Sequence, residues 1–121
     1  MKTLLAILFI SLLSSPSWSM TLGDLVERDG LHYEKFTDIP FTGEMTGNPQ
    51  GSYKNGKKDG AWVYYYPNGQ VYYKGNYKNN KREGKWVYYY PNGQVHYKGN
   101  YKNNKKEGAH IGWYQDRTVN K

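Results

Sequence analysis

Few side chains in this chain of 121 residues have the chemistry needed for catalysis or metal binding. Cysteine is absent, which excludes a disulfide framework, a thiol nucleophile, a Cys-ligated metal site and a bacterial lipid anchor on cysteine. The histidines His32, His96 and His110 are far apart in the sequence, and no cysteine is present to complete a zinc site with them. We therefore expect neither a metal nor a cofactor.

Three carboxylates recur at one interval: Asp59, Glu83 and Glu107 each precede a glycine and follow a lysine or arginine. A general acid–base pair needs two carboxylates that face each other across a cleft, about 5–10 Å apart. These three occupy equivalent positions of successive units, so we interpret them as solvated charge partners. No Ser–His–Asp set, phosphate-binding glycine loop or dinucleotide fingerprint is present. We therefore expect no enzymatic activity.

The basic residues form the clearest pattern of candidate binding residues, because most of them recur at an interval of 24. The full set, with two tyrosines beside it, is Lys54, Lys57, Lys58, Lys78, Lys81, Arg82, Lys102, Lys105, Lys106, Tyr77 and Tyr101. Such a basic, tyrosine-bearing surface suits an anionic lipid headgroup, an acidic glycan or an acidic protein. The alternative interpretation is protective, since lysines on exposed edges and turns block pairing between strand edges.

The interval of 24 comes from an internal repeat. The segments 62–84 and 86–108 differ at only two of 23 positions, where His96 replaces Tyr72 and Lys106 replaces Arg82. The last unit departs from the pattern, because His110 stands where the next tryptophan would recur. Atypical end units are typical of repeat proteins, whose outermost faces meet solvent.

Each unit predicts a β-hairpin. The run Trp62–Tyr66 is rich in β-branched and aromatic residues and predicts a strand. Asn68-Gly69 predicts a hairpin turn in which both residues adopt positive φ. Val71–Lys74 is the expected return strand. We expect a bend or bulge at Gly75, after which Tyr77 begins a short edge segment that leads into the connecting turn.

The composition indicates how such hairpins are held together. Aromatic residues make up 17% of the chain, too many for a disordered protein, whereas only 37% of residues are hydrophobic. One hairpin is marginal in water, so equivalent hairpins must stack. We expect Trp62 to be buried against Trp86 or its neighbours. The predicted fold class is all-β, an elongated solenoid-like stack of antiparallel β-hairpins held by an aromatic ladder.

The chain divides into four predicted segments. Residues 1–19 combine Lys2 with a short apolar run and small residues before Met20, which predicts a signal peptide cleaved before Met20 and a periplasmic or secreted protein. Residues 20–50 form an acidic N-terminal cap, 51–108 the hairpin repeats and 109–121 a degenerate C-terminal capping repeat. Basic residues beside aromatic rings also suit single-stranded nucleic acid, but export makes that an unexpected partner.

Charge separates the cap from the repeats. Residues 20–50 hold two basic and six acidic residues, whereas 51–121 hold fourteen basic and four acidic residues. Within the cap, Met20–Arg28 is expected to be a short helical turn or a loop. The runs Leu31–Phe36 and Phe41–Met45 predict two short strands, which we interpret as a degenerate first hairpin.

The repeated pattern resembles the MORN repeat family, in particular bacterial MORN-variant proteins catalogued as antitoxin components of toxin–antitoxin systems. The residues that carry the resemblance are Gly60, Trp62, Tyr65, Tyr66, Asn68, Gly69, Gln70, Gly75, Tyr77, Lys78 and Asn79, and their equivalents 24 residues later. The resemblance implies stacked hairpins and a scaffolding or interaction role, with phospholipid binding suggested in the wider family. Three hypotheses follow: a non-catalytic protein that binds another protein or anionic lipid, an antitoxin-like neutraliser, and a carbohydrate or cell-wall binding module.

Overall fold

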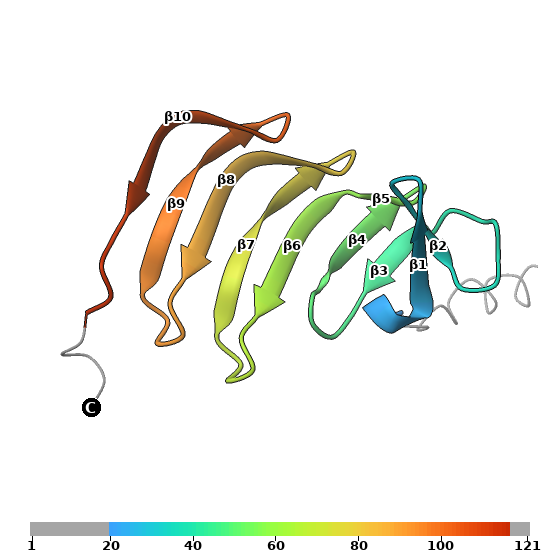
Figure 1. Ribbon diagram of the computed structural model, residues 1–121, viewed down its shortest axis with the longest axis horizontal. Helices are drawn as coiled ribbons and strands as arrows, with labels where there is room; N and C mark the ends of the chain where they lie inside the picture. The colour runs from blue at the N-terminus through green and yellow to red at the C-terminus, as the bar shows by residue number, and fades with distance from the viewer. Residues whose placement is uncertain (1–19, 117–121) are drawn as a thin grey trace, which may run out of the picture.

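The computed structural model describes residues 20–116. Over this part of the chain, strands lie side by side in one elongated row (Figure 1) and adjacent strands pair antiparallel. The predicted all-β stack of hairpins is therefore confirmed. The predicted signal peptide, residues 1–19, lies outside the described residues. Among residues 20–116, no helix is long and apolar enough to span a membrane.

One short 3-10 helix precedes ten strands in the described residues. The elements are η1 (Leu22–Asp24), β1 (Leu25–Arg28), β2 (Leu31–Glu34), β3 (Gly43–Met45), β4 (Gly51–Lys54), β5 (Lys57–Lys58), β6 (Gly60–Tyr65), β7 (Val71–Lys78), β8 (Lys81–Tyr89), β9 (Val95–Lys102) and β10 (Lys105–Gly112).

The strands form three sheets in sequence order. Strands β6 to β10 make a five-stranded sheet in which each strand pairs with the next, and β3, β4 and β5 make a three-stranded sheet. Strands β1 and β2 form a separate hairpin. The two larger sheets join through Gln50 and Val63, whose backbone N–H groups each donate to the other's carbonyl at 2.9 Å. The row is therefore continuous from β3 to β10 (Figure 1).

The turn between β6 and β7 has a different geometry from the predicted one. Gly69 has φ of 89°, but Asn68 is not among the residues with positive φ. The N–H of Gly69 donates to the carbonyl of Tyr66 at 2.9 Å, which closes a turn with Pro67 in its second position. This is a type I turn followed by a left-handed residue, the usual three-residue hairpin loop. Proline fixes φ near −65°, so it selects this turn over one with two positive φ angles.

The paired positive φ angles occur at the opposite end of the hairpins. Asn79 and Asn80, between β7 and β8, have φ of 51° and 69°. They form a two-residue turn, so Lys78 pairs directly with Lys81. Strand β7 runs without interruption through Gly75 to Lys78. The expectation that Tyr77 begins a separate edge segment before a longer connecting turn was therefore wrong.

The N-terminal part pairs differently from the expected hairpin. Residues 31–36 and 41–45 do contribute strands, but β2 pairs with β1 and β3 pairs with β4. The residues before Arg28 are partly a strand, because only η1 is helical. Asp29-Gly30 makes the β1–β2 turn with φ of 53° and 80°. Asp-Gly is a strong hairpin signal, so this pairing could have been inferred from the sequence.

The hydrophobic core at the N-terminal end joins the cap to the repeats. It consists of Leu25, Phe41, Met45, Tyr53 and Trp62, with Met20 and Tyr77 packed against it. The cap residues cover Tyr53 and Trp62 on the side where no preceding repeat exists. In a stack of hairpins the first unit needs such a cover, since its inner ring would otherwise face water.

Candidate binding surface

Each indole of the repeat lies against a glycine of a neighbouring strand. A Cβ atom at that glycine would fall inside the ring, where a side chain has no room. The pairs are Gly51 with Trp62, Gly75 with Trp86, and Gly99 with His110. The glycine of the repeat is therefore required by the close approach of a ring to the backbone, rather than by a bend.

A hydrogen bond fixes each ring in its position. The indole N–H groups of Trp62 and Trp86 donate to the carbonyls of Ser52 and Asn76, both at 3.1 Å. In the last unit, Nε2 of His110 lies 2.9 Å from the carbonyl oxygen of Asn100, the equivalent position. His110 therefore occupies the tryptophan position with the same backbone partner. Its Nδ1 forms a further hydrogen bond with the Tyr97 hydroxyl.

The buried rings form a ladder in which tyrosines separate the indoles. Tyr77 lies between Trp62 and Trp86, with ring centroids at 5.9 and 5.0 Å and the planes nearly perpendicular. The ladder runs Tyr53, Trp62, Tyr77, Trp86, Tyr101, His110. Edge-to-face contacts of this kind add about 0.5–1.5 kcal/mol per pair beyond area burial. Trp62 is thus buried against a neighbour of Trp86, one of the two predicted arrangements.

Tyr77 and Tyr101 belong to this ladder rather than to the surface. Tyr101 is only 5% exposed and Tyr77 is half-buried. Burial raises the pKa of Tyr77, and it raises the pKa of Tyr53 to about 12. The sequence placed Tyr77 and Tyr101 beside the lysines as binding residues, but their rings are already covered by neighbouring rings.

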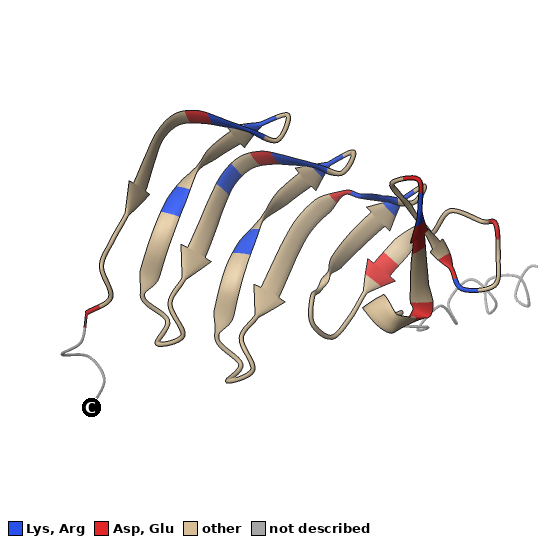
Figure 2. Cartoon of the chain, viewed as in Figure 1, with Lys and Arg blue, Asp and Glu red and all other residues tan. Residues whose placement is uncertain are grey.

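The predicted basic residues lie at the turns along one edge of the row, as Figure 2 shows. We call this the basic edge. Its fully exposed members are Lys54, Lys57, Lys78, Lys81, Lys102, Lys105 and Lys106, and its half-buried members are Lys58 and Arg82. Asp59, Glu83 and Glu107 lie beside these residues on the same edge. The topology therefore brings the predicted cations together, with one carboxylate in each turn region.

Two members of the basic edge also pack on the ladder. The Lys58 ammonium lies 4.9 Å from the ring centroids of both Trp62 and Tyr77, and the Arg82 guanidinium lies 4.1 Å from that of Tyr101. Burial lowers the pKa of Lys58. Cation–π contacts of this kind stabilise the stack, so Lys58 and Arg82 have a structural role that the exposed lysines lack.

Asparagines fix the spacing of successive turns. The backbone N–H of Lys58 donates to Oδ1 of Asn80 at 2.8 Å, and the backbone N–H of Asn80 donates to the carbonyl of Lys58 at 3.0 Å. One repeat later, Asn104 makes the corresponding backbone contact to Arg82. Equivalent turns are two strands apart, roughly 9.5 Å. The exposed lysines are thus held as a regular array.

A groove of about 510 Å³ lies on the ladder side of the sheet. Its walls are mainly tyrosine rings, and Lys106 contributes a cation. The lining residues are Tyr66, Tyr72, Tyr88, Tyr90, His96, Tyr97, Tyr101 and Lys106. We call this the tyrosine groove. The sequence analysis did not select its rings as a site, although their recurrence at an interval of 24 was a usable signal.

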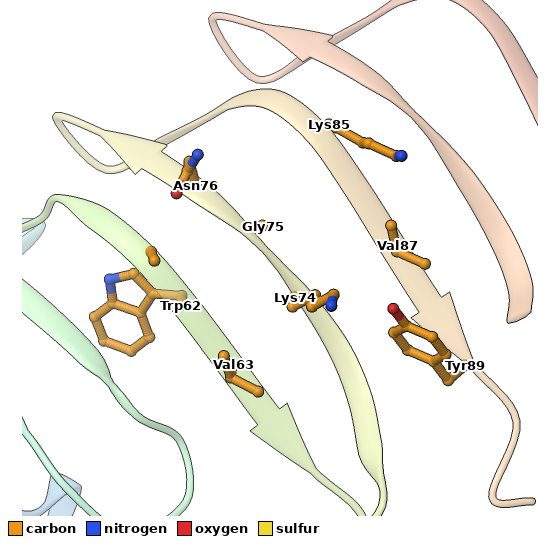
Figure 3. A pocket seen from close by; sticks show the side chains of 9 residues that line it. Trp62, Val63, Lys74, Gly75, Asn76, Lys85, Val87 and Tyr89 are labelled. Carbon is orange, nitrogen blue, oxygen red and sulfur yellow. The ribbon is translucent and has the colours of Figure 1, made fainter. Parts of the chain in front are cut away.

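The opposite face of the five-stranded sheet carries lysines that the sequence analysis did not select. Lys74 pairs with Val63 and Val87 on the adjacent strands, and Lys98 pairs with Val87 and Ile111. Figure 3 shows Lys74, Lys85, Val87 and Tyr89 around a hollow of about 370 Å³. Alternation along the strand predicts this placement, because Tyr73 and Tyr77 point to the ladder.

The histidines lie in ring contacts. The imidazole of His32 lies 4.8 Å from the ring of Tyr53, and that of His96 stacks on Tyr90 at 4.3 Å. Within residues 20–116, no three acidic, cysteine or histidine side chains gather closely enough to hold a metal ion. The arrangement of the described residues therefore offers surfaces for binding, with grooves of aromatic rings and rows of cations.

Residues 58–79 and 82–103 match the family described as MORN repeat variant. The chain therefore contains a MORN repeat variant domain. Each MORN match spans one hairpin, β6–β7 or β8–β9. MORN repeats are typically non-catalytic binding modules. No curated protein and no solved structure matches the chain significantly. The antitoxin-like role that the MORN resemblance implies, and export, stay predictions.

Proposed function

We propose that this MORN repeat protein is an exported, non-catalytic binding protein whose basic edge engages an anionic partner, either an acidic protein surface or anionic lipid headgroups. The observation that carries the proposal is the array of exposed lysines at equivalent turns, held at fixed spacing by Asn80 and Asn104. An ordered array of like charges concentrates an oppositely charged surface better than scattered charges do.

The position of these lysines argues against a purely protective role. Lys54, Lys78, Lys81 and Lys102 lie at the ends of β4, β7, β8 and β9, and each of these strands pairs on both sides. Lysines protect a sheet from aggregation where a strand edge is unpaired. Paired inner strands do not need this protection, so the lysines at their turns support a binding role.

The test compares two lysine-to-glutamine variants in vesicle co-sedimentation. The first replaces the six exposed lysines of the basic edge that do not stack on rings, and the matched control replaces Lys74, Lys85 and Lys98 on the sheet face. The six residues are Lys54, Lys57, Lys78, Lys81, Lys102 and Lys105. Near an anionic membrane each lysine contributes about 1 kcal/mol, and salt screens the contribution.

We expect the wild-type protein and the control to bind vesicles rich in phosphatidylglycerol, to ignore neutral vesicles and to release at high salt. The variant of the basic edge should lose this binding. If vesicles fail to bind, crosslinking in envelope fractions tests the protein version, in which the crosslinked partner is acidic and is lost with the same variant. Binding that persists in the variant of the basic edge contradicts the proposal.

A second candidate function is glycan binding in the tyrosine groove. Aromatic rings pack against the apolar faces of sugar rings, while hydroxyl groups at the rim supply hydrogen bonds, and ligand sites combine these features. Titration of the protein with soluble cell-wall glycan fragments tests it. Tyr72→Ala should weaken such binding at least fivefold, and an unchanged affinity in this variant excludes the groove as the site.

A further inference from the structure

Exposed apolar side chains gather at the two ends of the row. Seven large apolar residues are exposed in the described part of the chain, and six of them lie near an end. Leu22, Phe36 and Ile39 are in the N-terminal cap, and Ile111, Trp113 and Tyr114 are in or just after β10. Only Tyr72 lies between the ends. Exposed apolar residues that cluster, rather than scatter singly, mark interaction sites.

The N-terminal cap holds one apolar ring in an unfavourable backbone conformation. Phe36 is 100% exposed and has φ of 66°, a region that bulky residues rarely adopt. The loop is built to hold it: both the backbone N–H and the hydroxyl of Thr37 donate to the carbonyl of Glu34, at 3.1 and 2.9 Å. The N–H of Ile39 in turn donates to that hydroxyl at 3.2 Å. An exposed ring held this way indicates a use for it.

The C-terminal end presents an open strand edge. Strand β10 pairs only with β9 among the described residues, so its outer side offers unpaired backbone groups to a partner. Ile111 is 47% exposed on this strand, and Tyr114, just after it, is 97% exposed. No proline interrupts β10. This edge lacks the features that natural proteins use to prevent pairing, apart from the two lysines at its start.

The two ends carry opposite charge. The cap, residues 20–50, holds four more acidic than basic residues, whereas residues 51–121 hold ten more basic than acidic ones. Figure 2 shows acidic positions concentrated around β1 and β2, and basic positions at the β9–β10 turn at the far end. The two ends of one molecule are therefore complementary to each other in charge as well as alike in exposed apolar residues.

We propose that the occupant of the C-terminal end is the N-terminal cap of a second copy of this chain. In this contact the outer side of β10, with Ile111 and Tyr114, packs against the cap loop that holds Phe36 and Ile39. The contact is heterologous, so each added copy keeps one free end and the assembly does not close at a dimer. It leaves the basic edge uncovered, because that edge runs along the row rather than across its ends.

Sedimentation velocity of the full chain, expressed with its own N-terminal segment and purified in the form the cell produces, tests the proposal with two variants. The cap variant is Phe36→Ser with Ile39→Ser, and the edge variant is Ile111→Thr with Tyr114→Ser. Tyr72→Ser is the matched control, since it removes an exposed ring away from both ends. All five positions are exposed, and circular dichroism confirms that each variant is folded.

We expect the wild-type protein and the Tyr72→Ser control to grow beyond a dimer as concentration rises, and to dissociate at high salt. Each end variant alone should remain a monomer, and an equimolar mixture of the two should form a dimer and nothing larger. A wild-type protein that is monomeric throughout overturns the proposal. So does a cap variant that still associates by itself, because that result means that two β10 edges pair with each other.

Discussion

The indole of Trp86 lies directly on the backbone of Gly75, in the space that a Cβ atom would occupy. The same indole contacts Tyr77 on one side and Tyr101 on the other. One glycine thus admits the ring into the sheet, and the ring then joins two hairpins. The repeat of 24 residues preserves this relationship from unit to unit.

The first prediction concerns this close contact. Gly75→Ala places a methyl group against the indole of a side chain that is 1% exposed, so the ring must shift. Overpacking of this kind costs about 1–3 kcal/mol. Gly112→Ala is the matched control, because its new Cβ meets only ordinary contacts. Urea denaturation should show a lower midpoint for Gly75→Ala and little change for Gly112→Ala. Equal midpoints for the two variants would show that the ladder is not tightly packed there.

The second prediction uses the natural replacement at the end of the ladder. His110 keeps the backbone hydrogen bond of the tryptophan position, so Trp86→His should retain part of the stability that Trp86→Ala loses. Tryptophan-to-alanine changes in a core cost about 3–5 kcal/mol. We expect the unfolding free energy of Trp86→His to lie clearly between those of the wild type and Trp86→Ala. A histidine variant as unstable as the alanine variant contradicts this role of the ring nitrogen.

The hairpin stack could be predicted from the sequence because the repeat shows its own boundaries. Two nearly identical copies locate equivalent residues, and Pro67-Asn68-Gly69 marks one turn of each. The sequence also placed His110 in the tryptophan position. These inferences depend only on period and residue type, which survive without knowledge of side-chain contacts.

Pairing partners and ring positions were harder to predict. Gly75 was expected to bend the chain, since the sequence does not say which ring lies on it. Tyr77 and Tyr101 were expected beside the lysines, because strand alternation alone does not reveal that a neighbouring hairpin covers them. The wrong pairing in the cap arose because Asp29-Gly30 was not weighed as a turn. Long-range packing decided each of these points.

The third prediction concerns alkaline pH. Burial raises the pKa values of Tyr53 and Tyr73 to about 12, above the usual value near 10 of an unfolded tyrosine. The folded state therefore keeps protons that the unfolded state loses, so stability is fully present below pH 10 and falls between about pH 10 and 12. The slope is at most about 1.4 kcal/mol per pH unit for each tyrosine.

Tyr53→Phe separates the contribution of one ring from the rest. The Tyr53 hydroxyl is buried without a hydrogen-bond partner in the described residues, so its removal costs little at neutral pH. Urea unfolding measured at several pH values should give the variant a shallower loss of stability above pH 10. A slope identical to that of the wild type would mean that the Tyr53 hydroxyl reaches solvent in the folded protein.

The fourth prediction tests how the turns are held. Asn80 accepts a hydrogen bond from the N–H of Lys58 and donates one to the carbonyl of Gly30, at 2.8 and 2.9 Å. Asn80→Ala removes both and leaves a half-buried N–H without a partner, which costs about 1–3 kcal/mol. Asn79→Ala is the control, because Asn79 has the same left-handed backbone and is exposed. Amide hydrogen exchange should therefore speed up at Lys58 in Asn80→Ala and stay unchanged there in Asn79→Ala. Equal exchange in both variants would show that the backbone contact alone holds successive turns together.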